Sequence, residues 1–254
     1  MLLAIDIGNT STKFGIYHGD KLVSKFSIPT IRDYNVRELI LGHLRLLKNE
    51  LGQDMVDAAI VSSVVPEVDT AVTEVCLELL RITPNFVNSS YDFDLKVLYE
   101  PPASVGIDRL VAAFAAVEKY GSPCIVCDFG TATTIDAVNT RREYLGGTIT
   151  PGMKTMAQSL ANETSKLPDI AIEKPANVIG NSTVGSIQSG IFFGYIGLVE
   201  GIIRRMVSEI GGTTEVVATG GFASLIAENC EAVKIVDENL ILDGLRILSQ
   251  RNSK

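Results

Sequence analysis

The chain has 254 residues, of which 46% are hydrophobic and 20% are charged, and its mean hydropathy is +0.25. This composition is typical of a globular protein with one large or two small domains, and it excludes a disordered chain. The formal net charge of −8 argues against nucleic acid as a partner, because that needs a basic surface, but it leaves room for a small anionic substrate.

The sequence contains no run of about 18 or more apolar residues, and no basic segment precedes the first apolar stretch at Leu2. We therefore expect no transmembrane helix, no signal peptide and no membrane partner. A cytoplasmic protein with reduced cysteines follows from this expectation.

The first predicted element is a β-hairpin over residues 2–17, in which an apolar strand leads into Asp6 and a polar turn follows. Gly8 lets the backbone approach a ligand closely. The amide and hydroxyl side chains of residues 9–12 offer hydrogen bonds, and Lys13 adds a charge suited to phosphate. Asp6 can hold Mg²⁺ through water. Taken alone, the same pattern also fits an ordinary hairpin turn.

The remainder of the first half alternates between strands and helices. The predicted elements are a strand over residues 21–28, a helix over 35–51, a buried strand over 58–65, a helix from Pro66 to about Leu80 and a short strand at 86–87. An irregular or extended connection follows over residues 91–102.

A helix rich in alanine is predicted next, with Ser104 as its N-cap. Two adjacent charges, Asp108 and Arg109, lie at its front. They fit an exposed first turn, where aspartate is favoured by the helix dipole. They also fit a carboxylate base beside a guanidinium that binds an anionic substrate.

The hairpin design recurs at the start of the second half, which opens at Gly121–Pro123. An apolar strand again leads into an aspartate, Asp128, and the loop continues with Gly130 and hydroxyl side chains. Because the design is repeated, one copy in each half, a phosphate-binding function becomes the better interpretation of both loops.

The apolar strand of this second hairpin contains Cys124 and Cys127, a C-x-x-C pair that would suit a zinc or redox site. A redox pair belongs at a helix start, and neither His18 nor His43 stands at ligand spacing to complete a zinc site. We interpret these two cysteines, together with Cys76 and Cys230, as core residues.

After the second hairpin, the pattern predicts a strand that ends in a glycine-rich turn, and then two helices separated by an irregular segment. The elements are residues 143–152, a helix over 153–163, the irregular segment 164–182, a helix capped by Ser182 and ending at Gly211, strands at 215–218 and 233–236, and a closing helix over 240–249. An irregular segment of that length inside a domain is often functional.

The long helix before Gly211 carries glycines at positions 185, 190, 194, 197 and 201, so a partner could pack closely against it. Such a face can serve helix pairing in a membrane, but Gln188, Glu200, Arg204 and Arg205 interrupt it. We interpret it as an interface of a water-soluble protein.

The duplicated Asp-x-Gly hairpin resembles the superfamily of sugar kinases, heat-shock proteins and actin, in which two such loops grip the ATP phosphates from both sides. The whole set of motifs, in order along the chain, closely resembles the type III pantothenate kinase family. The motifs are Asp6-x-Gly8-Asn9-Thr10-x-x-Lys13, Gly106-x-Asp108-Arg109, Asp128-x-Gly130-Thr131-Ala132-Thr133, Gly146-Gly147-x-x-x-Pro151-Gly152 and Thr219-Gly220-Gly221.

This resemblance implies an α/β protein of actin-like ATPase architecture, with two ribonuclease-H-like halves, residues 1–118 and 119–254, each built on a mixed five-stranded sheet. It implies ATP-dependent phosphorylation of pantothenate to 4'-phosphopantothenate, the first step of coenzyme A biosynthesis. It further implies a homodimer and a need for Mg²⁺ and for K⁺ or NH4⁺. The alternatives are another small-molecule kinase of the superfamily, such as an acetate or sugar kinase, and a non-enzymatic ATP-binding regulatory module.

The resemblance also implies roles for individual residues. Those for ATP are Asp6, Ile7, Gly8, Asn9, Thr10, Ser11, Thr12, Lys13 and Thr131, with Asp6 also supporting Mg²⁺. Those for pantothenate are Tyr99, Gly106, Ile107, Asp108, Arg109 and Thr183, with Asp108 as the base. Asp128 holds the monovalent cation.

A comparison of the two hairpins supports this last role. Lys13 stands seven residues after Asp6, whereas Ile135 stands seven residues after Asp128. The second loop would therefore lack a cationic side chain, and a bound monovalent ion would offset the repulsion between Asp128 and the phosphates.

Overall fold

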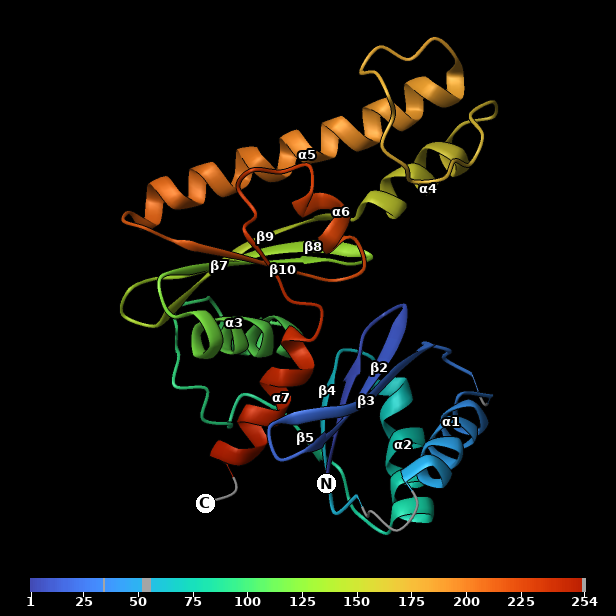
Figure 1. Cartoon of the computed structure of the whole chain (residues 1–254), viewed down its shortest axis with the longest axis vertical. Helices are drawn as coiled ribbons and strands as arrows, with labels where there is room; N and C mark the ends of the chain where they lie inside the picture. Colours follow the sequence, from blue (N-terminus) through green and yellow to red (C-terminus); the bar gives the residue numbers. More distant parts are fainter. Residues whose placement is uncertain (34, 52–55, 253–254) are drawn as a thin grey trace. The chain divides into compact units, whose positions relative to one another are not determined.

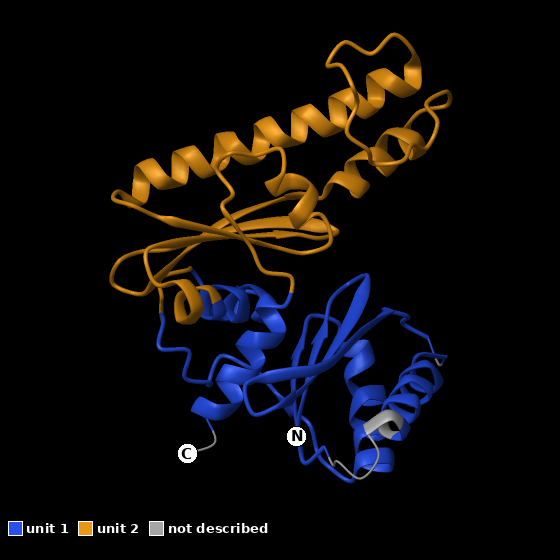
Figure 2. Ribbon diagram, viewed as in Figure 1, with its two compact units in different colours: residues 1–95, 100–115, 239–254 blue, residues 96–99, 116–238 orange. Residues whose placement is uncertain are grey.

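The computed structural model describes residues 1–33, 35–51 and 56–252. The chain forms two compact units (Figure 2), of which unit 1 contains residues 1–95, 100–115 and 239–254 and unit 2 contains residues 96–99 and 116–238. The predicted halves, 1–118 and 119–254, differ from these units chiefly at the end of the chain, because residues 239–254 belong to unit 1.

Unit 1 contains a five-stranded mixed sheet of order β3-β2-β1-β4-β5 (Figure 1). Its strands are β1 (Leu2–Ile7), β2 (Ser11–His18), β3 (Lys21–Pro29), β4 (Ala58–Ser63) and β5 (Asn85–Phe86). The predicted hairpin and the strands that follow it are thereby confirmed, with shifts of one or two residues at their ends.

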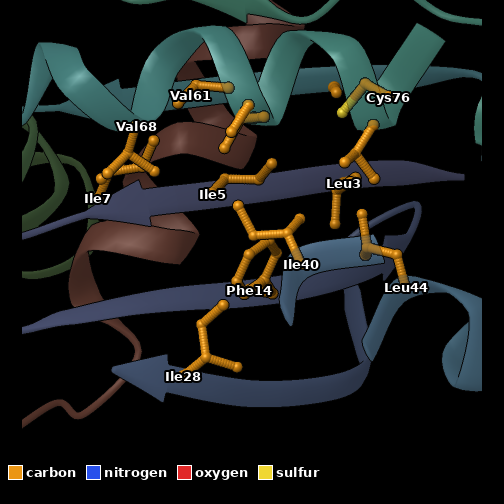
Figure 3. Close-up of a cluster of buried hydrophobic side chains, with 14 of the residues drawn as sticks. Leu3, Ile5, Ile7, Phe14, Ile28, Ile40, Leu44, Val61, Val68 and Cys76 are labelled. Carbon is orange, nitrogen blue, oxygen red and sulfur yellow. The ribbon is translucent and has the colours of Figure 1, made fainter. Parts of the chain in front are cut away.

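The two faces of this sheet are covered by different helices. Leu3, Ile5 and Ile7 alternate along β1 and pack with Ile40 of α1 (Asn35–Leu51) and Val68 of α2 (Pro66–Val75), as Figure 3 shows. The opposite face of β1, β2 and β4 contacts α7 (Leu240–Arg251), the last helix of the described chain. Successive residues of a strand point to opposite faces, so Asp6 lies on the α7 side.

Unit 2 contains a six-stranded sheet of order β11-β10-β7-β8-β9-β6. Its strands are β6 (Lys96–Val97), β7 (Cys124–Phe129), β8 (Ala132–Val138), β9 (Glu143–Pro151), β10 (Glu215–Thr219) and β11 (Ile235–Val236). Five of them, β9-β8-β7-β10-β11, repeat the order of unit 1, which is the predicted ribonuclease-H-like plan. The sixth, β6, comes from the segment predicted as a connection.

The helices of unit 2 are α4 (Met153–Glu163), α5 (Thr183–Ile210) and α6 (Ala223–Ala227). The predicted N-cap of α5 is confirmed, since the Ser182 hydroxyl accepts a hydrogen bond from the Gly185 N–H at 3.1 Å. By length and composition α5 could cross a membrane, but core helices of soluble proteins meet the same criterion, and 44% of its most apolar window is buried inside the protein.

One prediction about a helix end is wrong. Helix α3 (Ile107–Tyr120) begins after Gly106, because the Ser104 hydroxyl donates a hydrogen bond to the Pro101 carbonyl at 2.7 Å and closes a 3₁₀ turn. The predicted helix from Pro66 to about Leu80 is confirmed, since α2 ends at Val75 and continues as a π-helical turn, Cys76–Leu80.

All four cysteines are free and buried, as predicted. Burial raises the pKa of the Cys76 and Cys124 thiols to about 12. These thiols therefore remain protonated at neutral pH and fill the core.

Candidate active-site loops

The first phosphate-loop candidate is the turn between β1 and β2 in unit 1. Asp6 and Lys13 are directly opposite in the antiparallel register, and the Lys13 Nζ lies 4.0 Å from the Asp6 Oδ2. Asp6 is only 5% exposed. The hairpin therefore presents a carboxylate and an ammonium side by side, where a metal-bound phosphate needs both charges.

The turn itself is held by a short network that the sequence analysis missed. The Gly8 N–H bonds the Ser11 carbonyl at 3.1 Å, and the Thr30 hydroxyl donates to the Gly8 carbonyl at 2.7 Å. The Arg32 guanidinium donates to the Asn9 side chain at 2.6 Å. Thr30 and Arg32 follow β3 and belong to none of the quoted motifs, so only the tertiary fold reveals their role.

A third missed residue is Ser62 on β4. It pairs with Asp6 in the parallel register, so both side chains lie on the same face of the sheet. Its hydroxyl is buried and has no hydrogen-bond partner within the described part of the chain. Ser63 instead points toward α2, where its hydroxyl bonds Asp69 at 2.5 Å.

The second loop lies between β7 and β8 in unit 2, and its register corrects the comparison of the two hairpins. Asp128 is opposite Thr134, not Ile135, because this turn is one residue shorter than the first. Ile135 points into the core and is 0% exposed. Thr134, the residue that faces Asp128, is also uncharged, so the reason for expecting a bound cation is unchanged.

Three glycines allow this second loop to form. A Cβ on Gly220, which has φ +92°, would lie 2.4 Å from the Asp128 Oδ1, and one on Gly152 would lie 2.1 Å from the Gly130 carbonyl oxygen. The Thr131 carbonyl accepts the Gly152 N–H at 2.8 Å and the Thr155 hydroxyl at 2.7 Å. The glycines of three separate motifs are thus brought together around Asp128.

Behind this loop, the Thr133 hydroxyl is hydrogen-bonded to the hydroxyl of Tyr195 on α5. Burial raises the pKa of Tyr195 to about 12. The bond ties β8 to the long helix.

The start of α3 in unit 1 holds the predicted base and anion-binding residue. The Asp108 Oδ1 accepts a hydrogen bond from the Arg109 N–H at 2.8 Å, and Arg109 is only 7% exposed. A Cβ on Gly106 would lie 2.6 Å from this Asp108 oxygen. Gly106 therefore leaves the space in which the carboxylate folds over the helix start.

The other two predicted substrate residues, Tyr99 and Thr183, lie in unit 2. Tyr99 stands two residues after the end of β6, and its ring lies over Gly146 of β9. Thr183 begins α5 and lines a pocket of about 710 Å³ between α4, the segment after it and α5. Tyr99 is not among the residues that line this pocket.

The oxygen donors of the two loops indicate which cations they could bind. The described residues contain no group of three or more histidine, cysteine, aspartate or glutamate side chains that could hold a metal by themselves. Mg²⁺ commonly binds through one or two carboxylates, retained waters and substrate phosphates. Asp6, beside the Ser62 hydroxyl that no described residue bonds, fits that pattern, and the Asp128 carboxylate at the second turn offers oxygen donors to a cation.

A family model and a sequence relative of this chain both carry the name type III pantothenate kinase. A family model for type III pantothenate kinases matches residues 2–205. The type III pantothenate kinase of Anaeromyxobacter sp. is 45% identical over 254 residues, covering 99% of this chain and 100% of its own.

Two solved structures share the fold at low identity. An ethanolamine utilization protein from Carboxydothermus hydrogenoformans has a TM-score of 0.59 at 13% identity and covers 97% of this chain and 89% of its own. An activator of 2-hydroxyisocaproyl-CoA dehydratase from Clostridium difficile, with bound ADPNP, has a TM-score of 0.55 at 15% identity and covers 100% and 98%.

Proposed function

Because this chain belongs to the type III pantothenate kinase family, and so phosphorylates pantothenate with ATP in coenzyme A biosynthesis, we propose how its own residues perform that reaction. The proposal depends most on one observation: the chain carries two Asp-x-Gly hairpins of the same strand order, one in each unit. Each hairpin offers a carboxylate beside a glycine turn.

ATP is the phosphoryl donor, and we assign its phosphates to Asp6, Ile7, Gly8, Asn9, Thr10, Ser11, Thr12 and Lys13 of the first turn and to Thr131 of the second. The Lys13 ammonium supplies positive charge, and backbone N–H groups at a glycine turn can contact phosphate oxygens closely. Asp6 would hold Mg²⁺ through water, and the ion, when bound, neutralises charge on the phosphates.

Asp108 is assigned as the general base. The primary alcohol of pantothenate attacks the γ-phosphorus, the bond from that phosphorus to the ADP oxygen breaks, and the hydroxyl proton passes to the Asp108 carboxylate. The bond from the Arg109 N–H orients this carboxylate at the helix start. Transfer of the phosphoryl group then depends mainly on positioning and charge neutralisation.

Arg109 is assigned to the pantothenate carboxylate, since its planar guanidinium can donate two parallel hydrogen bonds to a carboxylate. Gly106, Ile107, Tyr99 and Thr183 are assigned to the remainder of the substrate. Asp128 is assigned to K⁺ or NH4⁺, and the uncharged residue opposite it in the strand register, Thr134, supports this role.

We also propose that the enzyme is a cytoplasmic homodimer that binds neither membrane nor nucleic acid. Gly190, Gly194 and Gly197 of α5 have open space where a side chain would be, so a second copy could pack closely there. The net charge of −8 disfavours nucleic acid. Light scattering of the purified wild type and of Gly194→Arg tests the dimer, because the arginine should prevent close packing there.

A coupled assay of ADP release tests the reaction against its alternatives. We expect turnover with pantothenate and not with acetate or a panel of sugars. Turnover of a sugar alone would favour another kinase of the superfamily, and ATP binding without any turnover would favour a regulatory module.

A further inference from the structure

The pair Gly146-Gly147 in β9 is not used by the reaction assigned above, yet the structure gives each glycine a specific neighbour. A Cβ on Gly146 would lie 2.8 Å from the Cδ2 and 3.1 Å from the Cε2 of Tyr99, and Gly146 has φ +97°. Any side chain here would occupy the place of the Tyr99 ring. Only glycine combines this backbone conformation with that space.

Tyr99 is attached to β9 through its backbone as well. β6 pairs with β9 in the parallel register, and the Leu98 N–H bonds the Tyr144 carbonyl at 2.9 Å. The Lys96 ammonium also lies 3.3 Å from Glu143, which is itself paired with Arg141 at 2.6 Å. The residues before Tyr99 are therefore fixed on the same strand that its ring covers.

The Tyr144 ring supports Tyr99 from one side, with ring centroids 6.4 Å apart and an interplanar angle of 51°. Tyr144 is itself fixed, because it is fully buried and its hydroxyl donates to the Asp136 Oδ1 at 2.7 Å. A Cβ on Gly147 would lie 2.0 Å from the Ile135 carbonyl oxygen and 2.7 Å from that same Asp136 oxygen. The second glycine thus leaves space for the backbone of β8 and for the carboxylate that holds Tyr144.

We propose that Gly146 is a positioning residue for the acceptor substrate, which acts by leaving space for the Tyr99 ring on β9, with Tyr144 and Asp136 holding the ring from the side. The proposal rests on the assignment of Tyr99 to the pantothenate site. It explains why one strand carries two consecutive glycines next to an aromatic residue from a distant segment.

The test is Gly146→Ala in the full-length enzyme. Carbon atoms pack best about 3.5–4.0 Å apart, so the new methyl group would displace the Tyr99 ring by about 1 Å. A misplacement of that size weakens the alignment of a bound substrate, and we expect the KM for pantothenate to rise about tenfold. The KM for ATP should not change, and kcat should stay within about threefold, because Tyr99 is not assigned to the phosphoryl transfer.

Backbone strain is separated from the effect on Tyr99 by a matched control and a double variant. Gly121 has φ +88° and open space around its Cα, so Gly121→Ala carries similar strain without touching Tyr99. Its KM for pantothenate should stay at the wild-type value. In a Tyr99→Ala enzyme the KM should already be high, and adding Gly146→Ala should raise it no further.

If Gly146→Ala does not fold, Tyr144→Phe replaces it, and its KM for pantothenate is again measured alone and combined with Tyr99→Ala. Loss of the bond to Asp136 should raise the KM for pantothenate about twofold to tenfold in the wild type and not in Tyr99→Ala.

The proposal would be overturned if the KM for pantothenate were unchanged in both Gly146→Ala and Tyr144→Phe. It would also be overturned if either substitution raised this KM equally in the wild type and in Tyr99→Ala. Both outcomes would leave the assignment of Tyr99 standing. An unchanged KM in Tyr99→Ala itself would refute the assignment and the proposal together.

Discussion

Replacing Gly220 by alanine tests the construction of the second loop directly. Gly220 follows β10 with φ +92°, and a Cβ there would lie 2.4 Å from the Asp128 Oδ1 and 2.7 Å from the N and C atoms of Phe129. Two of the three nearest atoms belong to the backbone of β7, which cannot move without disturbing the hairpin. The substitution therefore combines a strained backbone with a steric clash.

The expected loss of stability follows from these two effects. The left-handed conformation costs about 1–2 kcal/mol for a residue with a side chain, and insertion of a methyl group into a packed site costs about 1–3 kcal/mol. In a chain of this length each kcal/mol lowers Tm by about 2–4 °C. We expect Gly220→Ala to lower Tm by at least about 4 °C and to weaken the activation by K⁺, because the Asp128 carboxylate must move.

Thermal unfolding followed by circular dichroism, without ligands, measures the first effect, and initial rates against K⁺ concentration measure the second. Gly221→Ala is the matched control, since a Cβ on Gly221 would meet no atom within 4 Å. A Gly220→Ala enzyme with the Tm of the wild type, or an equal loss in Gly221→Ala, would refute the reasoning.

Four further predictions concern single side chains. Asp108→Asn should lower kcat by about 100-fold or more with its fold and substrate binding intact, and near wild-type turnover would remove Asp108 from the role of base. Arg109→Lys keeps the charge but not the planar fork, so the KM for pantothenate should rise while that for ATP does not; equal rises would contradict the assignment. Activity should be negligible with only Na⁺ or Tris and should be restored by K⁺ or NH4⁺, and Asp128→Ala should abolish this response along with most activity; a K⁺ response that survives would place the ion elsewhere. Hydrogen bonds from Arg141 and then Asn139 lower the pKa of Glu143 from 4.5 to about 2, so its charged form stabilises the fold above about pH 4.5 and this contribution is lost as pH falls toward 2; the difference in urea midpoint between wild type and Glu143→Gln should shrink between pH 6 and pH 3, and a constant difference would contradict the pairing.

Much of the fold could be predicted because its signals are local. Both hairpins combine apolar strands with a glycine turn, and the Ser182 cap stands directly before a long apolar helix. Their prediction needs only neighbouring residues. The repeated strand order was expected from the resemblance to the superfamily of sugar kinases and actin.

The incorrect predictions concern choices that neighbouring residues do not determine. Ser104 has the right chemistry for an N-cap, but it lies three residues before Ile107, where the helix begins, and its hydroxyl donates to the Pro101 carbonyl. Counting seven residues from Asp128 gave Ile135, whereas the length of the turn places Thr134 opposite. Strand β6 has only two residues, and its pairing with β9 comes from a distant part of the chain.

The motifs name candidate site residues, but they do not show how those residues are arranged. Ser62, Thr30 and Gly220 approach the two candidate loops through sheet pairing or tertiary contact. Ser62 in particular stands beside Ser63 at the end of β4, and its relation to Asp6 exists only in the register of β1 and β4. Such relations require the fold before they can be recognised.

The packing of α7 against the first sheet has a consequence for the order in which the molecule is built during synthesis. The Tyr17 hydroxyl bonds Asp243 at 2.7 Å, so residues 226 positions apart meet in unit 1. Nearly all of unit 2, residues 116–238, leaves the ribosome before α7 does. The face of the first sheet that α7 covers therefore stays exposed until residues 240–251 have been synthesised. The strands made first are the last to be buried on both faces.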